Sequence, residues 1–154
     1  MVRIIKSTVI IMTLIAIIIP AKKINAENIA DYERAKGIAY TKYIKQKEAD
    51  ERIETGNCLT MANGVYTYNG HRETYYNLNM SRIVEILKNE GIEGEYQVRE
   101  DGCKMYGDYI MVAANFKLYP RGTIVETSRG LGIVADTGTF VENYPDGFDI
   151  AVDW

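Results

Sequence analysis

Three aspartates near the C-terminus, Asp136, Asp149 and Asp153, have the residue type and the spacing to do chemistry. A carboxyl group can protonate a leaving oxygen and then accept a proton, so one aspartate can serve as both general acid and general base. Asp149 and Asp153 are four residues apart, which is about 13 Å along a strand at ~3.3 Å per residue. That is too far for the paired carboxyls of a glycoside hydrolase, which lie ~5–9.5 Å apart.

The final segment, FDIAVDW, predicts a strand with two distinct faces, because successive side chains point to opposite sides of a sheet. The face suited to a core holds four apolar residues, Phe148, Ile150, Val152 and Trp154. The other face holds Asp149, Ala151 and Asp153, and we interpret it as the wall of a groove.

The triplet Asp136-Thr137-Gly138 permits more than one interpretation. The same triplet occurs in aspartic proteases, where two carboxylates share a proton. This chain has one such triplet, so a protease of this kind would have to form a dimer. In a purely structural role, Asp136 would accept hydrogen bonds from its own turn.

The segments around this triplet resemble the 3D domain, which is named for three aspartates. The matching segments are residues 113–115, 120–123, 136–138 and 148–150. The resemblance implies a mainly β fold, a small six-stranded double-psi β-barrel with one or two helices, formed by residues 56–154. That barrel is related to the catalytic barrel of MltA-type lytic transglycosylases.

The resemblance also implies an activity, the cleavage of peptidoglycan glycan strands at the β-1,4 bond between N-acetylmuramic acid and N-acetylglucosamine. The muramic C6 hydroxyl attacks C1 and a 1,6-anhydro product forms without water. Asp149 takes the family's catalytic position, and Asp136 is the second acid that approaches it. Two nearby carboxylates raise the pKa of one of them, which suits an acid catalyst.

Asn115 departs from the family pattern, since many members have the first aspartate there. An asparagine keeps the hydrogen bonding but loses the charge. The alternative function is therefore a non-catalytic barrel that binds glycan or a partner protein. The residues expected to contact substrate are Asn115, Thr137, Tyr75, Tyr119 and Asp153. The tyrosines could equally be half-buried packing residues.

Residues 1–26 predict a secretory signal peptide or a membrane anchor. Arg3 and Lys6 precede an apolar run of about a dozen residues, short for a bilayer span, and Ala26 offers a small residue for cleavage. We therefore expect the protein outside the cytoplasmic membrane, secreted or anchored to its outer face. The remaining residues carry 14 basic and 21 acidic side chains, which argues against nucleic acid as a partner.

Periodicity predicts the elements that position these residues. Residues 27–55 read as a helical linker and residues 79–90 as an amphipathic helix. Asn69-Gly70 and Asp101-Gly102 each predict a hairpin turn between short β-type runs. His71 is the single histidine, and no metal site or cofactor is indicated.

Two cysteines, Cys58 and Cys103, leave two alternatives open. Export would permit a disulfide between them, which would add ~2–4 kcal/mol to stability. Two free thiols fit the sequence equally, because this spacing carries no motif. We expect a monomer whose partner is the peptidoglycan glycan strand.

Overall fold

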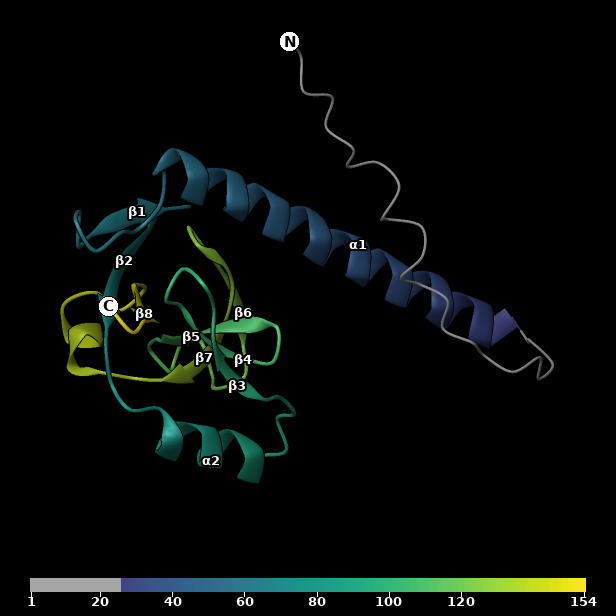
Figure 1. Cartoon of the computed structure of the whole chain (residues 1–154). Helices are drawn as coiled ribbons and strands as arrows, with labels where there is room; N and C mark the ends of the chain where they lie inside the picture. The colour runs from purple at the N-terminus through teal and green to yellow at the C-terminus, as the bar shows by residue number, and fades with distance from the viewer. Residues whose placement is uncertain (1–25) are drawn as a thin grey trace, which may run out of the picture. The chain divides into compact units, whose positions relative to one another are not determined.

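The computed structural model describes residues 26–154 (Figure 1). The predicted signal peptide or anchor in residues 1–25 lies outside the described residues. In the described part of the chain, none of the helices has the length and apolar character to cross a membrane. The described residues divide at position 38, and residues 39–154 form one compact unit.

Helix α1 (Ala26–Thr55) confirms that the segment predicted as a linker is helical. Its second half, from Ala39 onward, belongs to the same compact unit as the sheet. Ala49 is fully buried, and Arg52 Nε donates a hydrogen bond to the Ser128 carbonyl at 2.9 Å. The ammonium of Lys42 lies 4.6 Å from the centre of the Tyr109 ring. This half of the helix is therefore a packed part of the unit.

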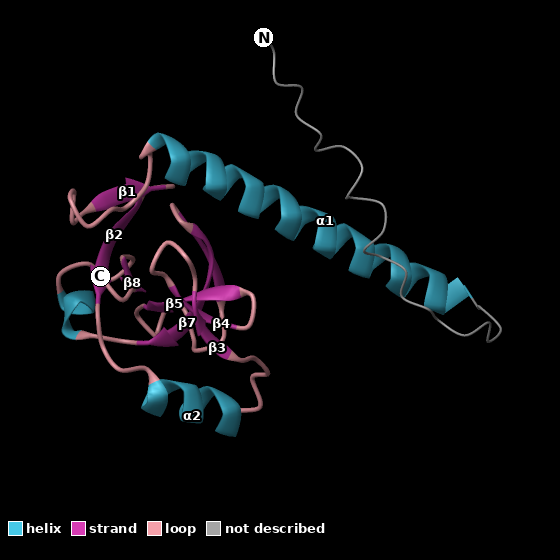
Figure 2. Cartoon of the chain, in the orientation of Figure 1, coloured by secondary structure: helices cyan, strands magenta, loops and turns pink. Residues whose placement is uncertain are grey.

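The rest of this unit is dominated by one mixed sheet, so the predicted mainly β class with one or two helices is confirmed; residues 26–154 form two α-helices (Figure 2). The sheet has eight strands where six were expected: β1 (Tyr66–Tyr68), β2 (His71–Tyr76), β3 (Tyr96–Val98), β4 (Lys104–Tyr106), β5 (Tyr109–Ala113), β6 (Ile124–Thr127), β7 (Gly130–Asp136) and β8 (Phe148–Ala151). Within residues 26–154, β1, β3 and β6 each pair with a single neighbour, so these pairings leave the sheet open.

Strand β5 is the centre of the sheet and is buried from Ile110 to Ala113. It pairs in parallel with β7, and it pairs antiparallel with β4 near its start and with β8 near its end. Gly132 on β7 faces Ile110, and a Cβ there would come within 2.9 Å of the Val112 side chain. The absence of a side chain at Gly132 therefore allows β5 and β7 to pack closely.

The predicted hairpin turn at Asn69-Gly70 is confirmed. Asn69 has φ 49° and Gly70 has φ 84°, and β1 pairs antiparallel with β2 on either side. Both residues with positive φ fit the turn type whose twist matches that of the flanking strands. The turn at Asp101-Gly102 likewise joins β3 to β4, as expected.

The sheet buries apolar side chains on both faces. The first core contains Leu59, Cys103, Met105, Ile110, Val112, Ala114, Val125, Val134, Phe148, Ile150 and Val152. The second core contains Met80, Leu87, Tyr106, Met111, Ile133, Ala135 and Ala151. Helix α2 (Ser81–Asn89), which confirms the predicted amphipathic helix, contributes Leu87 to the second core. Gly91, with φ 76°, follows the end of that helix.

Strand β8 shows where the expected groove wall was wrong. Phe148, Ile150 and Val152 lie in the first core, as predicted. Ala151 on the opposite face is fully buried in the second core, so that face is mostly covered. A strand with cores on both sides leaves only Asp149 partly exposed within Phe148–Ala151.

Candidate functional site

Asp136 and Asp149 are brought together by the central strand. Ala113 on β5 pairs with Asp136 on one edge and with Asp149 on the other. Neighbouring strands lie ~4.8 Å apart, so the two Cα atoms are about 10 Å apart. Residues directly opposite each other project to the same face, so the two acids flank one small, buried alanine.

A β-bulge makes this arrangement possible. Val112 pairs with Val134, but the next residue, Ala113, pairs with Asp136, which leaves Ala135 as the extra residue. The Ala114 amide donates to the Asp136 carbonyl at 2.9 Å and holds the shifted register. Without the extra residue, Asp136 would face the first core, because a shift of one residue reverses the side.

The carboxyl of Asp149 is half-buried and accepts one hydrogen bond from a neutral group. Thr74 on β2 is its strand partner, and the Thr74 hydroxyl donates to Asp149 Oδ1 at 2.8 Å. Burial raises the pKa of Asp149 above its ordinary value, although the Thr74 hydrogen bond and the charge of Arg72 act in the opposite direction. The main cause is therefore burial, whereas the sequence had suggested a neighbouring carboxylate.

Tyr76 lies two residues after Thr74 and therefore on the same face of β2. Its hydroxyl is buried and has no hydrogen-bond partner among the described residues. Burial raises the pKa of Tyr76, and the charges of Asp136 and Asp149 raise it further. The hydroxyl is thus within electrostatic reach of both acids, and it keeps a free donor for a group bound beside them.

Arg72 completes a polar row on this face of β2. It lies two residues before Thr74 and four before Tyr76, so the three side chains share one face of the strand. Its guanidinium lies 4.2 Å from the centre of the Tyr144 ring. The sequence analysis did not assign a role to Arg72 or Thr74. The alternation of side chains in HRETYY is enough to predict that these residues share a face of the strand. It could not predict that this face lies beside Asp149, because the parallel pairing of β2 with β8 joins segments more than seventy residues apart.

Two of the residues predicted to contact substrate form hydrogen bonds within their own turns. Asn115 Oδ1 accepts a hydrogen bond from the Lys117 amide at 3.1 Å. Thr137 is exposed, and its amide donates to Asp136 Oδ1 at 2.9 Å. Asp136 therefore accepts a hydrogen bond within its own turn, as expected for a purely structural role. It also lies on the same face of the sheet as Asp149.

The two tyrosines expected to contact substrate pack against the first core. The Tyr75 ring lies 4.5 Å from that of Trp154, and the Tyr119 ring lies 5.2 Å from that of Phe148. Tyr75 lies between Thr74 and Tyr76 in the strand, so its side chain projects to the opposite face, away from the acids. The tyrosine on the acids' face is Tyr76.

Asp153 is exposed and lies beyond the end of β8. Its amide donates to the Gly102 carbonyl at 3.0 Å, which ties the C-terminal segment to the β3–β4 turn. Its charge acts on Lys104 and Tyr96, so it belongs to a different part of the molecule from the two paired acids.

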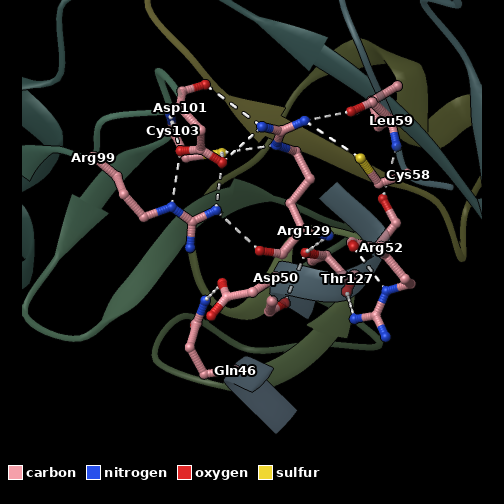
Figure 3. Close-up of polar contacts among 12 residues, drawn as sticks. Gln46, Asp50, Arg52, Cys58, Leu59, Arg99, Asp101, Cys103, Thr127 and Arg129 are labelled. Atoms are coloured by element: carbon pink, nitrogen blue, oxygen red, sulfur yellow. Dashed lines mark hydrogen bonds and ion pairs between the residues drawn. The ribbon is translucent and has the colours of Figure 1, made fainter. Parts of the chain in front are cut away.

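Cys58 and Cys103 are both free and buried, which is the free-thiol alternative (Figure 3). The guanidinium of Arg129 lies between them, with Nε 3.2 Å from Cys103 Sγ and Nη1 3.5 Å from Cys58 Sγ. Burial raises the pKa of the Cys103 thiol to about 11, and the charge of Asp101 adds to this effect. Both thiols are therefore packing groups with little thiolate character at neutral pH.

Asp101 balances the charge of this buried cluster. Its Oδ2 accepts from Arg129 Nη2 at 2.6 Å and from Arg99 Nη2 at 2.7 Å (Figure 3). Burial disfavours the ionised Asp101, but the hydrogen bonds and charges of the two arginines outweigh it, so the pKa of Asp101 lies below its ordinary value. The cluster joins the segments around residues 58, 101 and 129.

Two cavities lie away from the paired acids. One, about 620 Å³, is lined by Asn77, Leu78, Asn79, Met80, Ser81, Val84, Glu85, Tyr96 and Lys104. A second, about 470 Å³, lies between α1 and the β3–β4 hairpin. Neither is lined by Asp136 or Asp149. In residues 26–154, no group of three or more His, Cys, Asp or Glu side chains could hold a metal ion.

Comparison of the chain with protein-family models, with curated proteins and with solved structures found no match.

Proposed function

We propose that this chain is a lytic transglycosylase-like protein that cleaves peptidoglycan outside the cytoplasmic membrane, with Asp149 as its acid/base. The observation that supports this proposal is the register that places Asp149 and Asp136 on one face, both opposite Ala113. A partly buried carboxyl with a raised pKa is suited to donate a proton near neutral pH.

In the proposed reaction, protonated Asp149 gives its proton to the glycosidic oxygen as the bond from C1 of N-acetylmuramic acid breaks. The Asp149 carboxylate then takes the proton of the muramic C6 hydroxyl, whose oxygen bonds to C1. The enzyme is returned to its protonated form, and the product is a 1,6-anhydro sugar. The Thr74 hydroxyl holds Asp149 in position, and Asp136, on the same face, would bind the sugar.

The fold proposed for this activity is the six-stranded double-psi β-barrel of the 3D domain. The parallel pairs β2–β8 and β5–β7, set among antiparallel pairs around one central strand, support it. For a closed barrel we expect slow hydrogen exchange at the amides on both edges of β6 (Ile124–Thr127). Rapid exchange at the edge that does not pair with β7 would contradict the barrel.

The activity is tested by incubating the mature protein with purified sacculi and analysing the soluble products by mass spectrometry. We expect 1,6-anhydro-muropeptides from the wild type, and a loss of at least about 100-fold in Asp149→Asn, because general acid–base catalysis contributes ~10²–10⁴-fold. Asp146→Asn is the matched control, since Asp146 is exposed and its side chain has no described contact. Intact sacculi with the wild type would contradict the proposal.

The second candidate is a glycan-binding module without catalysis. One observation favours it: Asn115 uses its side chain in its own turn. Co-sedimentation with sacculi without any released product, unchanged in Asp149→Asn, is the result expected for this candidate.

A further inference from the structure

A cavity of about 620 Å³ lies apart from the paired acids. It lies where β2 leads into α2, just beyond Tyr76, and Lys104 on β4 lines it. Its volume is in the range of small-molecule sites, about 300–1,000 Å³. The start of α2 also lines it, and there the Asn79 side chain accepts a hydrogen bond from the Ser81 amide at 2.9 Å.

Lys104 gives this cavity a buried positive charge. Its side chain is among the buried polar groups, at 5 % exposure. The ammonium donates to Asn77 Oδ1 and to the Leu78 carbonyl, both at 2.6 Å, and both acceptors are neutral. An ammonium has three donors, so one remains. Across the described chain no carboxylate forms an ion pair with Lys104, although a buried charge is costly unless it is paired.

One acid lines the same cavity, and the charge of a second reaches its lining. Glu85 on α2 lines it and is exposed. The charge of Asp153, which is also exposed, acts on both Lys104 and Tyr96, and both of these residues line the cavity. A buried cation therefore has one exposed carboxylate beside it in the cavity and a second within electrostatic reach.

We infer that this cavity binds a zwitterionic amino-acid or short-peptide group, with the ligand's carboxylate on Lys104 and its ammonium facing Glu85 and Asp153. The carboxylate would supply the counter-charge that Lys104 lacks and accept its third hydrogen bond. Naming the source of this ligand rests on the proposed function, under which it is the peptide stem of peptidoglycan. The cavity would then hold the stem peptide apart from the site at Asp149 that cleaves the glycan.

Isothermal titration calorimetry of the full chain with the dipeptide D-alanyl-D-alanine tests this inference without any glycan. We expect measurable binding of the free dipeptide, and affinity at least about tenfold lower for its C-terminal amide and for its N-acetyl form, because each loses one charge-assisted contact. Lys104→Met should cause a similar loss. Lys88→Met, at an exposed lysine of α2 that does not line the cavity, is the matched control and should bind as the wild type does.

The blocked dipeptides are tested on the wild-type chain, so the result does not depend on whether Lys104→Met folds. Glu85→Gln, at an exposed position, should weaken the free dipeptide but leave the weak binding of the N-acetyl form unchanged. Equal affinity for the free acid and the amide, or no binding at about 10 mM dipeptide, would overturn the inference. Because no glycan is present, this failure is distinct from a failure to cleave sacculi.

Discussion

Asp149 is a carboxyl held by one neutral hydrogen bond, from Thr74, on a face that is otherwise mostly covered. No cation forms an ion pair with it among residues 26–154. Burial disfavours its ionised form, so this acid costs the fold some stability at neutral pH.

We expect Asp149→Asn to be more stable than the wild type at pH 7, by roughly 1 kcal/mol. The pKa of Asp149 is raised by folding, so the stability associated with its protonated form is fully present below the unfolded pKa, near ~4, and is lost as the pH rises through the folded pKa. The difference between variant and wild type should therefore grow from pH 4 to pH 7. Urea unfolding at several pH values measures it.

The control for this prediction is Asp146→Asn, which removes an exposed acid near β8 and should leave the stability unchanged. A variant Asp149→Asn that is less stable than the wild type at pH 7, or a difference independent of pH, would contradict the prediction.

Arg129 is the residue whose loss should destabilise the unit most strongly. Its guanidinium donates to Asp101, to the Leu59 carbonyl and to both thiols. We expect Arg129→Met to lower the free energy of unfolding by about 3–5 kcal/mol, because it leaves buried acceptors without their donor. Arg129→Lys should restore less than half of the lost free energy of unfolding, since a single ammonium cannot reach all the acceptors that the forked guanidinium contacts.

Equilibrium urea unfolding measures the effect of both substitutions. Arg82→Met is the matched control, because Arg82 is exposed on α2 and has no described side-chain contact; we expect a change within ~0.5 kcal/mol. A similar small change in Arg129→Met would show that the cluster of Arg99, Asp101 and Arg129 contributes little.

Among the elements, the β1–β2 hairpin depends most directly on a local backbone requirement. Gly70 has φ 84°, where a Cβ is strained although the space around it is open. We expect Gly70→Ala to cost about 1–2 kcal/mol, and Gly70→Asn to cost less because asparagine tolerates this region. Thermal unfolding of the two variants compares them, and an alanine variant as stable as the wild type would contradict the assigned turn.

Strand β5 explains how a short element can organise several others. One edge of β5 pairs with β7, and the other edge pairs with both β4 and β8. Ala113 is the residue at which β7 and β8 meet across β5, and the bulge next to it sets the face of Asp136. The site therefore depends on the register of three strands rather than on any one loop.

At the scale of the whole chain, the second half of α1 belongs with the sheet. The compact unit begins at Ala39, whereas the sequence analysis placed the body after residue 55. Residues 45, 49 and 52 supply an ion pair to Glu126, a fully buried side chain and a hydrogen bond to Ser128.

A chain of residues 39–154 should therefore unfold at the same urea midpoint as the full protein. A chain of residues 56–154 should unfold at a lower midpoint, because its free energy of unfolding falls by several kcal/mol. The loss follows from the exposed surface beneath Ala49 and the unpaired Ser128 carbonyl. Equal midpoints for the two fragments would mean that the helix is an independent linker after all.

Local pattern in the sequence was enough to predict the helices at residues 27–55 and 79–90, the Asn69-Gly70 turn and the apolar face of β8, because each follows from side-chain periodicity or backbone preference over a few residues. Asp136 and Asp149 could be chosen as candidate acids from their residue type. Only the tertiary structure decided that they share a face, that Thr74 and Tyr76 accompany them, and that Tyr75 and Tyr119 do not. Those facts depend on pairings between distant strands and on one bulge, and a shift of a single residue in register would have reversed them.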